Sequence, residues 1–526
     1  MSVSSVVEPF VSEPRQINPW LIAVSVMFAT FMEVLDTTVV NVSLPHIAGS
    51  LSVTIDEATW ALTSYLVANA IILPMTGWLA SMFGRKRLLM LSVVGFTASS
   101  FLCGLAPTLP LLVAFRILQG ATGGCLQPLS QAVLLEAFPP QDRGKAMGFW
   151  ALGIVVAPIL GPVLGGWLTD NYSWRWVFYI NIPVGVASIV MTKMFIFDPA
   201  YLRTENRRVD YWGIGMLAVG IGALQIVLDK GQEDDWFASR MITTLSLLSA
   251  VTLIALVVHE LTTDDPVVDL RVFKARSYAV GVFLMTVVGF VLYGSMVLLP
   301  IMLQTLLGYP PLQAGIAMAP RGVGSFFMMP VTGLMTGRFD ARKLLTTGLL
   351  IGGGSLLWLS WLNLQAGYWD IFWPQLIQGA GMSLLFVPLT TVTMDPIPRE
   401  RMGNATSLFN LMRNIGGSVG IATTGTMLAR NNQATTTLLS ANVTAYDPAS
   451  QAMLAQMKGA FMAAGADATT ATTRAYAVMF GFVQRQAAMV SFVGIFQLLG
   501  ILFIALIPLV LLMKRPSGTG SPVAAH

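Results

Sequence analysis

The chain of 526 residues is 55% hydrophobic and only 11% charged, with a mean hydropathy of +0.70. Ordinary soluble domains carry about 25% charged residues, so this composition excludes a soluble enzyme and indicates an all-α integral membrane protein. The net charge of +4 is expected to reflect membrane topology and not nucleic-acid binding.

Fourteen apolar stretches are long enough to cross a bilayer, which takes about 20 helical residues. In chain order we predict membrane helices at 20–42, 59–81, 88–106, 109–137, 144–168, 174–197, 210–229, 241–261, 278–307, 313–337, 343–363, 371–394, 404–429 and 488–513. The stretch at 278–307 is long, and we interpret it as one tilted helix.

The positions of Lys and Arg predict how these helices are oriented. With the N-terminus in the cytoplasm, 19 basic residues fall on the cytoplasmic side and seven on the opposite side. This asymmetry fits the positive-inside rule, so we expect a multi-pass protein with both termini in the cytoplasm.

Part of the sequence recurs about 256 to 260 residues downstream. At the offset of 256, the repeated residues are Pro74, Thr76, Gly77, Phe83, Leu88 and Leu89, which recur as Pro330, Thr332, Gly333, Phe339, Leu344 and Leu345. Two similar membrane bundles in one chain are typical of a transporter whose site lies at their interface. We therefore predict two pseudo-symmetric six-helix bundles, at 1–200 and 271–526, separated by two inserted membrane helices at 201–270.

The segment 430–487 differs from the rest of the second bundle. It is rich in Ala, Thr, Gln and Asn, and it is extracytoplasmic in the predicted topology. A connection of this length is usually functional or mobile. Two interpretations stay open, a tolerated spacer and a helical platform that binds another protein.

The first predicted helix contains two acids, Glu33 and Asp36, three positions apart and hence neighbours on one helical face. Two carboxylates this close in a low dielectric repel each other, so at least one has a raised affinity for protons. A proton-coupling site requires such a group. The alternative is that one acid forms a fixed structural bridge with a buried arginine. We favour the proton role for Asp36 and leave Glu33 open.

Arginines also lie inside predicted helices, at Arg116, Arg321 and Arg413. Arginine does not lose its charge in proteins, so it cannot carry the proton, although it can bias a carboxylate by pairing with it. We expect this role of Arg116. For Arg321 and Arg413 a conformational role and structural pairing stay equally open.

Small residues mark two further sites. The fifth predicted helix carries Gly148, Gly161, Pro162, Gly165 and Gly166, a pattern that permits a neighbouring helix to approach closely at the bundle interface. The loop from Gly77 to Arg87 includes Gly84 and Arg85. We expect its glycines to form a tight turn and its basic residues to face the cytoplasm.

Candidate substrate-binding residues are polar, Met or aromatic side chains within the predicted helices, although Met and aromatic residues in such helices more often pack against a neighbouring helix or lipid. They are Met32, Asn41, Tyr65, Gln119, Tyr293 and Phe386. A site lined by Met and aromatic side chains discriminates poorly between ligands, which predicts a loose specificity for lipophilic compounds.

Several of these segments resemble motifs of one family, the major facilitator superfamily, and within it the fourteen-helix drug:proton antiporter branch of the EmrB and QacA type. Residues 35–45 resemble L-D-x-T-V-V-N-V-A-L-P, and 77–87 resemble G-x-L-A-D-R-x-G-R-[RK]-[RK]. Residues 116–120 resemble R-x-x-Q-G, 148–166 resemble the antiporter motif G-x8-G-x3-G-P-x2-G-G, and 174–183 resemble W-R-W-x-F-x-I-N-x-P. The likeness covers essentially the whole chain.

The chain departs from these motifs at several positions. Ser81 stands where the loop motif has Asp, so a charge relay through that acid cannot be assumed. Ala157 replaces a glycine and Ser43 an alanine, both mild changes. Glu33 is an additional acid that the helix motif does not require.

The resemblance implies proton-driven efflux of hydrophobic and amphiphilic toxic compounds, by alternating access, across the bacterial inner (plasma) membrane. It implies no cofactor beyond the proton motive force, contact with membrane lipids, and a periplasmic adaptor with an outer-membrane channel, for which 430–487 is the expected docking surface. The alternatives are proton-coupled uptake, export of a specific metabolite, a channel and a membrane enzyme. The sequence has no G-x-x-x-x-G-K-[ST] and no H-E-x-x-H, and its three His and two Cys show no metal spacing, so we expect neither catalysis nor a metal site.

Overall fold

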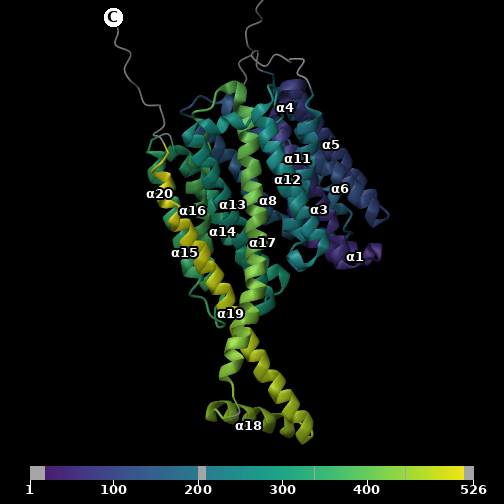
Figure 1. Cartoon of the computed structure of the whole chain (residues 1–526), viewed down its shortest axis with the longest axis vertical. Coiled ribbons are helices and arrows are strands. Elements are labelled where there is room, and N and C mark those ends of the chain that lie inside the picture. Colours follow the sequence, from purple (N-terminus) through teal and green to yellow (C-terminus); the bar gives the residue numbers. More distant parts are fainter. Residues whose placement is uncertain (1–17, 199–208, 337, 445, 514–526) are drawn as a thin grey trace, which may run out of the picture.

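The computed structural model describes residues 18–198, 209–336, 338–444 and 446–513, and every regular element in these ranges is helical. Most helices run side by side in one bundle, from which two long helices project at one end (Figure 1). This architecture confirms the all-α membrane fold predicted from composition.

The helices that precede residue 200 are here called the N-terminal set, and the first of them is α1. Asn18 caps the first turn of α1, because its Oδ1 accepts a hydrogen bond from the backbone N of Trp20 (3.0 Å). Helix α1 packs against α7, α8 and α10, and α3 packs against α6. The set comprises α1 (Pro19–Leu51), α2 (Ile55–Ala58), α3 (Trp60–Ile72), the 3-10 turn η1 (Leu73–Met75), α4 (Thr76–Phe83), α5 (Arg85–Leu105), α6 (Leu109–Gly123), α7 (Leu126–Ala137), α8 (Arg143–Asn171), α9 (Trp176–Tyr179) and α10 (Asn181–Phe195).

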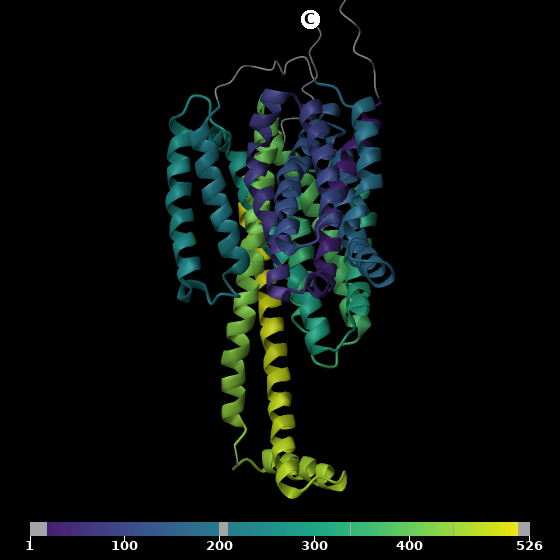
Figure 2. The ribbon, with the colours of Figure 1, turned by 90° about the vertical axis from the view of Figure 1, so that its right-hand side faces the viewer.

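The inserted pair consists of α11 (Tyr211–Lys230) and α12 (Arg240–Thr262), with the 3-10 turn η2 (Trp236–Ala238) between them. The two helices pack on each other and stand at one edge of the bundle (Figure 2). A second 3-10 turn, η3 (Leu270–Lys274), leads into the next helix.

The C-terminal set is built around α13 and α17, which pack against each other, and around α16, which packs against α14 and α15. The stretch predicted as one long helix at 278–307 is α13 followed directly by the π-helical turn η4. The set comprises α13 (Arg276–Ile301), η4 (Met302–Leu306), α14 (Pro311–Thr336), α15 (Ala341–Leu359), α16 (Tyr368–Met394), η5 (Arg399–Arg401), α17 (Met402–Asn442), α18 (Pro448–Ala463), α19 (Ala468–Ala505) and α20 (Ile507–Val510).

Eleven helical segments of the described ranges are long and apolar enough to cross a membrane. They coincide with eleven of the fourteen predicted spans, so fourteen crossings are not confirmed. The other three predicted spans fall on α14, α15 and α17, which are helical but less apolar. Arg321 and Arg413 lie in two of these helices, and the third, α15, carries Arg342 and Lys343 in its first turn.

The segment 430–487 forms a helical stalk. Helix α17 continues to Asn442, α19 already begins at Ala468, and α18 lies across the foot between them (Figures 1 and 2). Asp447 caps α18 by accepting from the backbone N of Ser450 (2.9 Å), and hydrogen bonds from Ser450 hold the pKa of that carboxyl below its usual value. Our predicted helix ends at 429 and 488 follow the apolar sequence, whereas the helices continue because Ala-rich polar sequence is also helix-forming.

Two interfaces join the N-terminal and C-terminal sets. Helix α8 packs on α14, where a Cβ atom at Gly148 would lie 2.8 Å from the carbonyl O of Met329. Helix α17 packs on α4 and α7, and a Cβ atom at Gly77 would lie 2.5 Å from the backbone N of Asn404. Because Asn404 lies in the first turn of α17, the contact with Gly77 is at the end of the bundle opposite the stalk.

The remaining α8 glycines differ in what they face. A Cβ atom at Gly161 would collide with Thr38 of α1, and one at Gly165 would lie 3.0 Å from the carbonyl O of Val39. A Cβ atom at Gly166 would meet no atom within 4 Å. The close approach expected from the sequence therefore exists, but Gly161 and Gly165 make it within the N-terminal set, against α1.

These contacts predict that Gly161→Leu and Gly165→Leu each block transport, because a larger side chain pushes α8 away from α1 at a packing cost of about 1–3 kcal/mol. Transport by each variant is compared with that of Gly166→Leu, the matched control on the open face, which we expect to be tolerated. Transport at the wild-type rate by all three variants would show that the α1–α8 contact is dispensable.

Candidate functional site

Asp36 lies in the middle of α1 and is completely buried. One of its oxygens, Oδ2, accepts a hydrogen bond from Nη1 of Arg116 on α6 (2.6 Å). The other, Oδ1, accepts from Nε2 of Gln119 (2.9 Å) and from Nδ2 of Asn181 on α10 (2.7 Å). The ionised carboxylate is thus compensated by a cation and two amides from two other helices.

Arg116 is held in place from several sides. Its Nε donates to the carbonyl O of Ala61 on α3 (2.8 Å), and its Nη1 also donates to Oε1 of Gln119 (2.8 Å). Its guanidinium lies over the ring of Tyr65, 4.2 Å from the centroid, a cation–π arrangement. The structure therefore brings together Asp36, Arg116, Gln119 and Tyr65, all of which we selected from the sequence.

Asn181 is the functional residue that our sequence reasoning missed. It follows Asp36 by 145 positions and shares its amide between Asp36 and Oγ of Ser100 (3.0 Å). An uncharged amide gives no signal by composition. The signal that could have found it is the 174–183 segment, whose motif includes this asparagine.

Glu33, although three residues from Asp36, faces different partners. Its Oε1 accepts from Nδ2 of Asn69 on α3 (3.0 Å), whereas its other oxygen, also buried, has no hydrogen-bond partner. A charge buried in a membrane bundle is costly unless it is paired. Glu33 in its ionised form is much less compensated than Asp36, so the two acids occupy chemically distinct sites.

Arg413 of α17 reaches across to the N-terminal set. Its Nη2 donates to Oε1 of Gln127 on α7 (2.5 Å), and it also contacts the side chain of Asn414. No carboxylate among the described residues lies within 4 Å of its guanidinium. A conformational role and structural pairing both stay open for Arg413, whose hydrogen bond to Gln127 joins the two sets.

Two further hydrogen bonds connect α17 with α7. Nδ2 of Asn410 donates to Oε1 of Gln131 (2.6 Å), and the hydroxyl of Thr406 donates to the carbonyl O of Pro128 (3.1 Å). Together with Arg413 they form a polar seam along the first three turns of α17.

Arg321 of α14 is less connected. Its Nη2 is buried and has no hydrogen-bond partner. Its backbone carbonyl O is where a Cβ atom at Gly379 would collide, which shows that α14 and α16 are in close contact. The geometry assigns no specific partner to its side chain.

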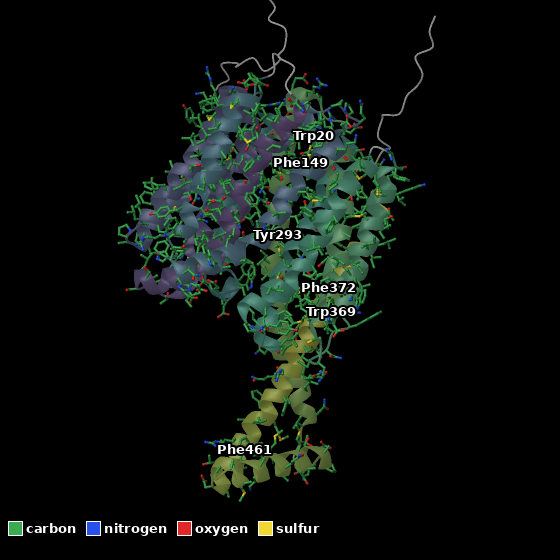
Figure 3. The ribbon with its side chains drawn as sticks, turned by 180° about the vertical axis from the view of Figure 1, so that it is seen from behind. Trp20, Phe149, Tyr293, Trp369, Phe372 and Phe461 are labelled. Carbon is green, nitrogen blue, oxygen red and sulfur yellow. The ribbon has the colours of Figure 1, made fainter. Side chains whose placement is uncertain are left out.

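The candidate lining residues do not form one surface. Met32 and Tyr65 are buried at 0% and 1% exposure, whereas Asn41 is exposed and lies outside the Asp36 network. Tyr293 is half-buried against Gly417 and lies near the middle of the molecule (Figure 3).

Phe386 provides an aromatic contact between the two sets. It stacks on Trp150 of α8 with ring centroids 6.5 Å apart, and Nε1 of Trp150 donates to the hydroxyl of Thr30 on α1 (3.0 Å). Trp150 is a second residue that our sequence reasoning missed. This contact connects α16 with the helix that carries Asp36.

The loop between α4 and α5 turns at Gly84, whose φ of +80° is in the region that favours glycine. Arg85 does not face solvent as expected, because it is buried at 3% exposure and forms an ion pair with Glu136 of α7. The hydroxyl of Ser81, at the departure from the loop motif, donates to the carbonyl O of Trp78 (2.7 Å).

The side chain of Pro162 lies outside the described residues. In the described part of the chain, no group of three His, Cys, Asp or Glu could hold a metal ion.

Comparison with known proteins agrees with this architecture. The profile of the Major Facilitator Superfamily matches residues 26–421. The multidrug export protein EmrB of Escherichia coli (strain K12) is 38% identical over 502 residues, covering 95% of this chain and 96% of EmrB. The fatty acid resistance protein FarB of Neisseria gonorrhoeae is 39% identical over 502 residues, with 95% and 97% covered. The crystal structure of the human organic anion transporter MFSD10 matches with a TM-score of 0.60 at 12% identity, covering 93% of this chain and all of that one, which supports the fold alone.

Proposed function

Because the chain belongs to the major facilitator superfamily, in the group of EmrB-type proteins, we propose that it exports amphiphilic toxic compounds in exchange for protons. The observation that carries this proposal is the buried ion pair between Asp36 and Arg116, at the centre of the N-terminal set. The chain is then a multi-pass transporter of the bacterial inner membrane with cytoplasmic termini, built of bundles at 1–200 and 271–526 with the helices of 201–270 inserted.

The proposed coupling group is Asp36. When Asp36 is ionised it holds α6 and α10 to α1 through Arg116, Gln119 and Asn181. A proton on Asp36 cancels the attraction for Arg116, which stays charged. Protonation thereby loosens α1, the helix that also packs on α8 at the interface with the second set. Glu33 is the proposed second proton site, since among the described residues Asn69 is the side chain that donates a hydrogen bond to its carboxylate and the other oxygen has none.

Alternating access follows from the two interfaces between the sets. The contacts Gly77–Asn404 and Gly148–Met329 and the polar seam hold the sets together towards the end opposite the stalk. The distribution of basic residues supports a cytoplasmic position for that end, and in this proposal the structure is an arrangement closed towards the cytoplasm. The return step opens these contacts.

The proposed substrates are lipophilic small molecules. The names of the relatives EmrB and FarB describe multidrug export and fatty acid resistance for those proteins. In this chain, Phe386 and Trp150 form an aromatic contact between the sets, and Tyr293 is a half-buried aromatic residue of the C-terminal set. Aromatic surface binds apolar ligands with few directional demands, which is consistent with a broad substrate range.

The stalk is the proposed docking surface for a periplasmic adaptor that leads to an outer-membrane channel. It exposes large apolar side chains outside the membrane bundle, among them Tyr446 at 93%, Tyr476 at 57% and Phe480 at 50% exposure. No residue of α18 is buried, and Phe461 of this helix lies at the far end of the stalk (Figure 3). Apolar side chains that gather on an aqueous surface are typical of protein–protein contacts.

We predict that Asp36→Asn abolishes energised efflux, because an amide cannot cycle a proton. Efflux of a transported dye from proteoliposomes with an imposed proton gradient is the measurement. Glu33→Gln is expected to have a milder effect, and Asp56→Asn, an exposed aspartate on α2, is the matched control and should transport normally.

Asp36→Asn also leaves Arg116 without its counter-ion, which can destabilise a protein by about 3–5 kcal/mol. The double variant Asp36→Asn/Arg116→Gln removes both charges and separates folding from coupling. If either variant pumps at the wild-type rate under a proton gradient, Asp36 is not the coupling group.

A second prediction concerns the stalk. Replacing residues 440–480 by a Gly/Ser linker should preserve drug-for-proton exchange in vesicles, because the Asp36 network lies far along the chain in the other set. The same variant should remove drug resistance in cells with two membranes. Full resistance in such cells would identify the stalk as a spacer.

A further inference from the structure

Helix α11 of the inserted pair lies between the two sets. It packs against α3 of the N-terminal set and against α17 of the C-terminal set, and the pair stands at one edge of the bundle with α12 packed on α11 (Figure 2). The sequence of the inserted pair has few polar groups within the membrane and predicts a peripheral or scaffolding role. Its side-chain contacts with the two neighbours differ in kind.

Towards α3, the contacts involve charged groups. The hydroxyl of Thr63 donates to the carboxylate of Asp229, and Nζ of Lys230 donates to the hydroxyl of Thr59 (2.6 Å). Nearby on α11, a Cβ atom at Gly222 would be in ordinary contact with α3, 3.4 Å from Ile71. The surface between α11 and α3 is therefore both close-packed and anchored by two charges.

Towards α17, the contacts are neutral. Nε2 of Gln225 donates to the hydroxyl of Ser418 (3.0 Å), and that hydroxyl can donate in turn to Oε1 of the same glutamine (3.2 Å). Farther towards the stalk, Nε1 of Trp236 donates to the hydroxyl of Thr426 (2.9 Å). Hydrogen bonds between neutral side chains of membrane helices are individually weak, so they can be exchanged.

The turn that presents Trp236 is strained. Asp235 and Trp236 both have φ of +53°, a backbone region that bulky side chains rarely adopt. Such conformations persist only where surrounding contacts impose them, and they occur at switch regions. Here the surrounding contacts are Thr426 of α17 and Gly231 at the end of α11, whose carbonyl O accepts from the backbone N of Trp236 (2.7 Å).

The partners of α17 change along its length. Its first three turns bond to α7 through Thr406, Asn410 and Arg413, whereas Ser418 and Thr426 bond to the inserted pair. If the two sets rock against each other, the contacts of α17 with α7 and its contacts with the inserted pair cannot both be kept in both access states.

From this arrangement we infer that α11 is a state-dependent latch, which moves with α3 and holds α17 only in the access state described here. The inference rests on the proposed function in assuming alternating access. It gives the inserted helices a mechanical role, in which Gln225, Ser418 and Trp236 help to set the balance between the two states.

The test is reversible crosslinking in the full-length protein with Cys103→Ala and Cys125→Ala, which removes both natural cysteines. One variant adds Gln225→Cys and Ser418→Cys, and the matched variant adds Thr63→Cys and Asp229→Cys. A short bis-methanethiosulfonate reagent joins each pair, and a reductant releases it. We expect the crosslink between α11 and α17 to stop transport until it is reduced, and the crosslink between α3 and α11 to leave transport intact.

A second readout does not depend on knowing the substrate. In vesicles, the rate of crosslinking between positions 225 and 418 should change at least about threefold when a proton gradient is imposed, the effect of one interhelical hydrogen bond. The rate between positions 63 and 229 should not change. A gradient-dependent rate in a protein that exports no drug would refute the proposed substrates and leave the latch standing. Transport that survives both crosslinks, or is lost with both, would refute the latch.

Discussion

A charge in the interior of a membrane bundle is costly, and the position of Asp36 is the constraint on which the rest of this structure depends. The carboxylate is completely buried and is compensated by Arg116, Gln119 and Asn181 from two other helices. Arg116 in turn donates a hydrogen bond to the carbonyl O of Ala61 on α3. Four helices are therefore held in register by one titratable group, and a change in its charge alters the packing of all four.

The contacts between the two sets are of a different kind. They consist of glycines against backbone, at Gly77 and Gly148, and of neutral or singly charged side chains along α17. Such contacts pack closely, and the described residues form no ion pair across this interface, so separating the sets breaks no buried pair of opposite charges. The strongest electrostatic interaction lies within one set, and the interface that must open depends on weaker ones. Coupling then requires only that loosening α1 shifts α8, which packs on both α1 and α14.

The sequence predicted much of this arrangement because membrane helices leave strong local signals. Apolar length located eleven membrane-spanning helices, and the acids and arginines inside apolar segments pointed to Asp36 and Arg116. Features set by three-dimensional neighbours were not predictable in the same way. Asn41 is five residues after Asp36, which is about 140° around a helix from it, and it points away from the network.

Four other features were also not predictable from the local sequence. Asn181 and Trp150 acquire their roles from helices distant in the chain, and Arg85 is buried because Glu136 of another helix pairs with it. The helices α17 and α19 extend well beyond the apolar sequence, since hydrophobicity marks the limits of the bilayer and not the limits of hydrogen bonding along the backbone. The close approach of Gly161 and Gly165 was predictable, but its partner, α1, was not.

The central claim is that a proton on Asp36 and the transported compound stabilise different states of one protein. The most direct measurement is proton release by purified protein in unbuffered solution, followed with a pH-sensitive dye while a transported lipophilic compound is added. The account predicts that binding releases protons from the wild-type protein and that release falls sharply in Asp36→Asn. Binding without any release of protons, across the range in which carboxylates titrate in proteins, would contradict it.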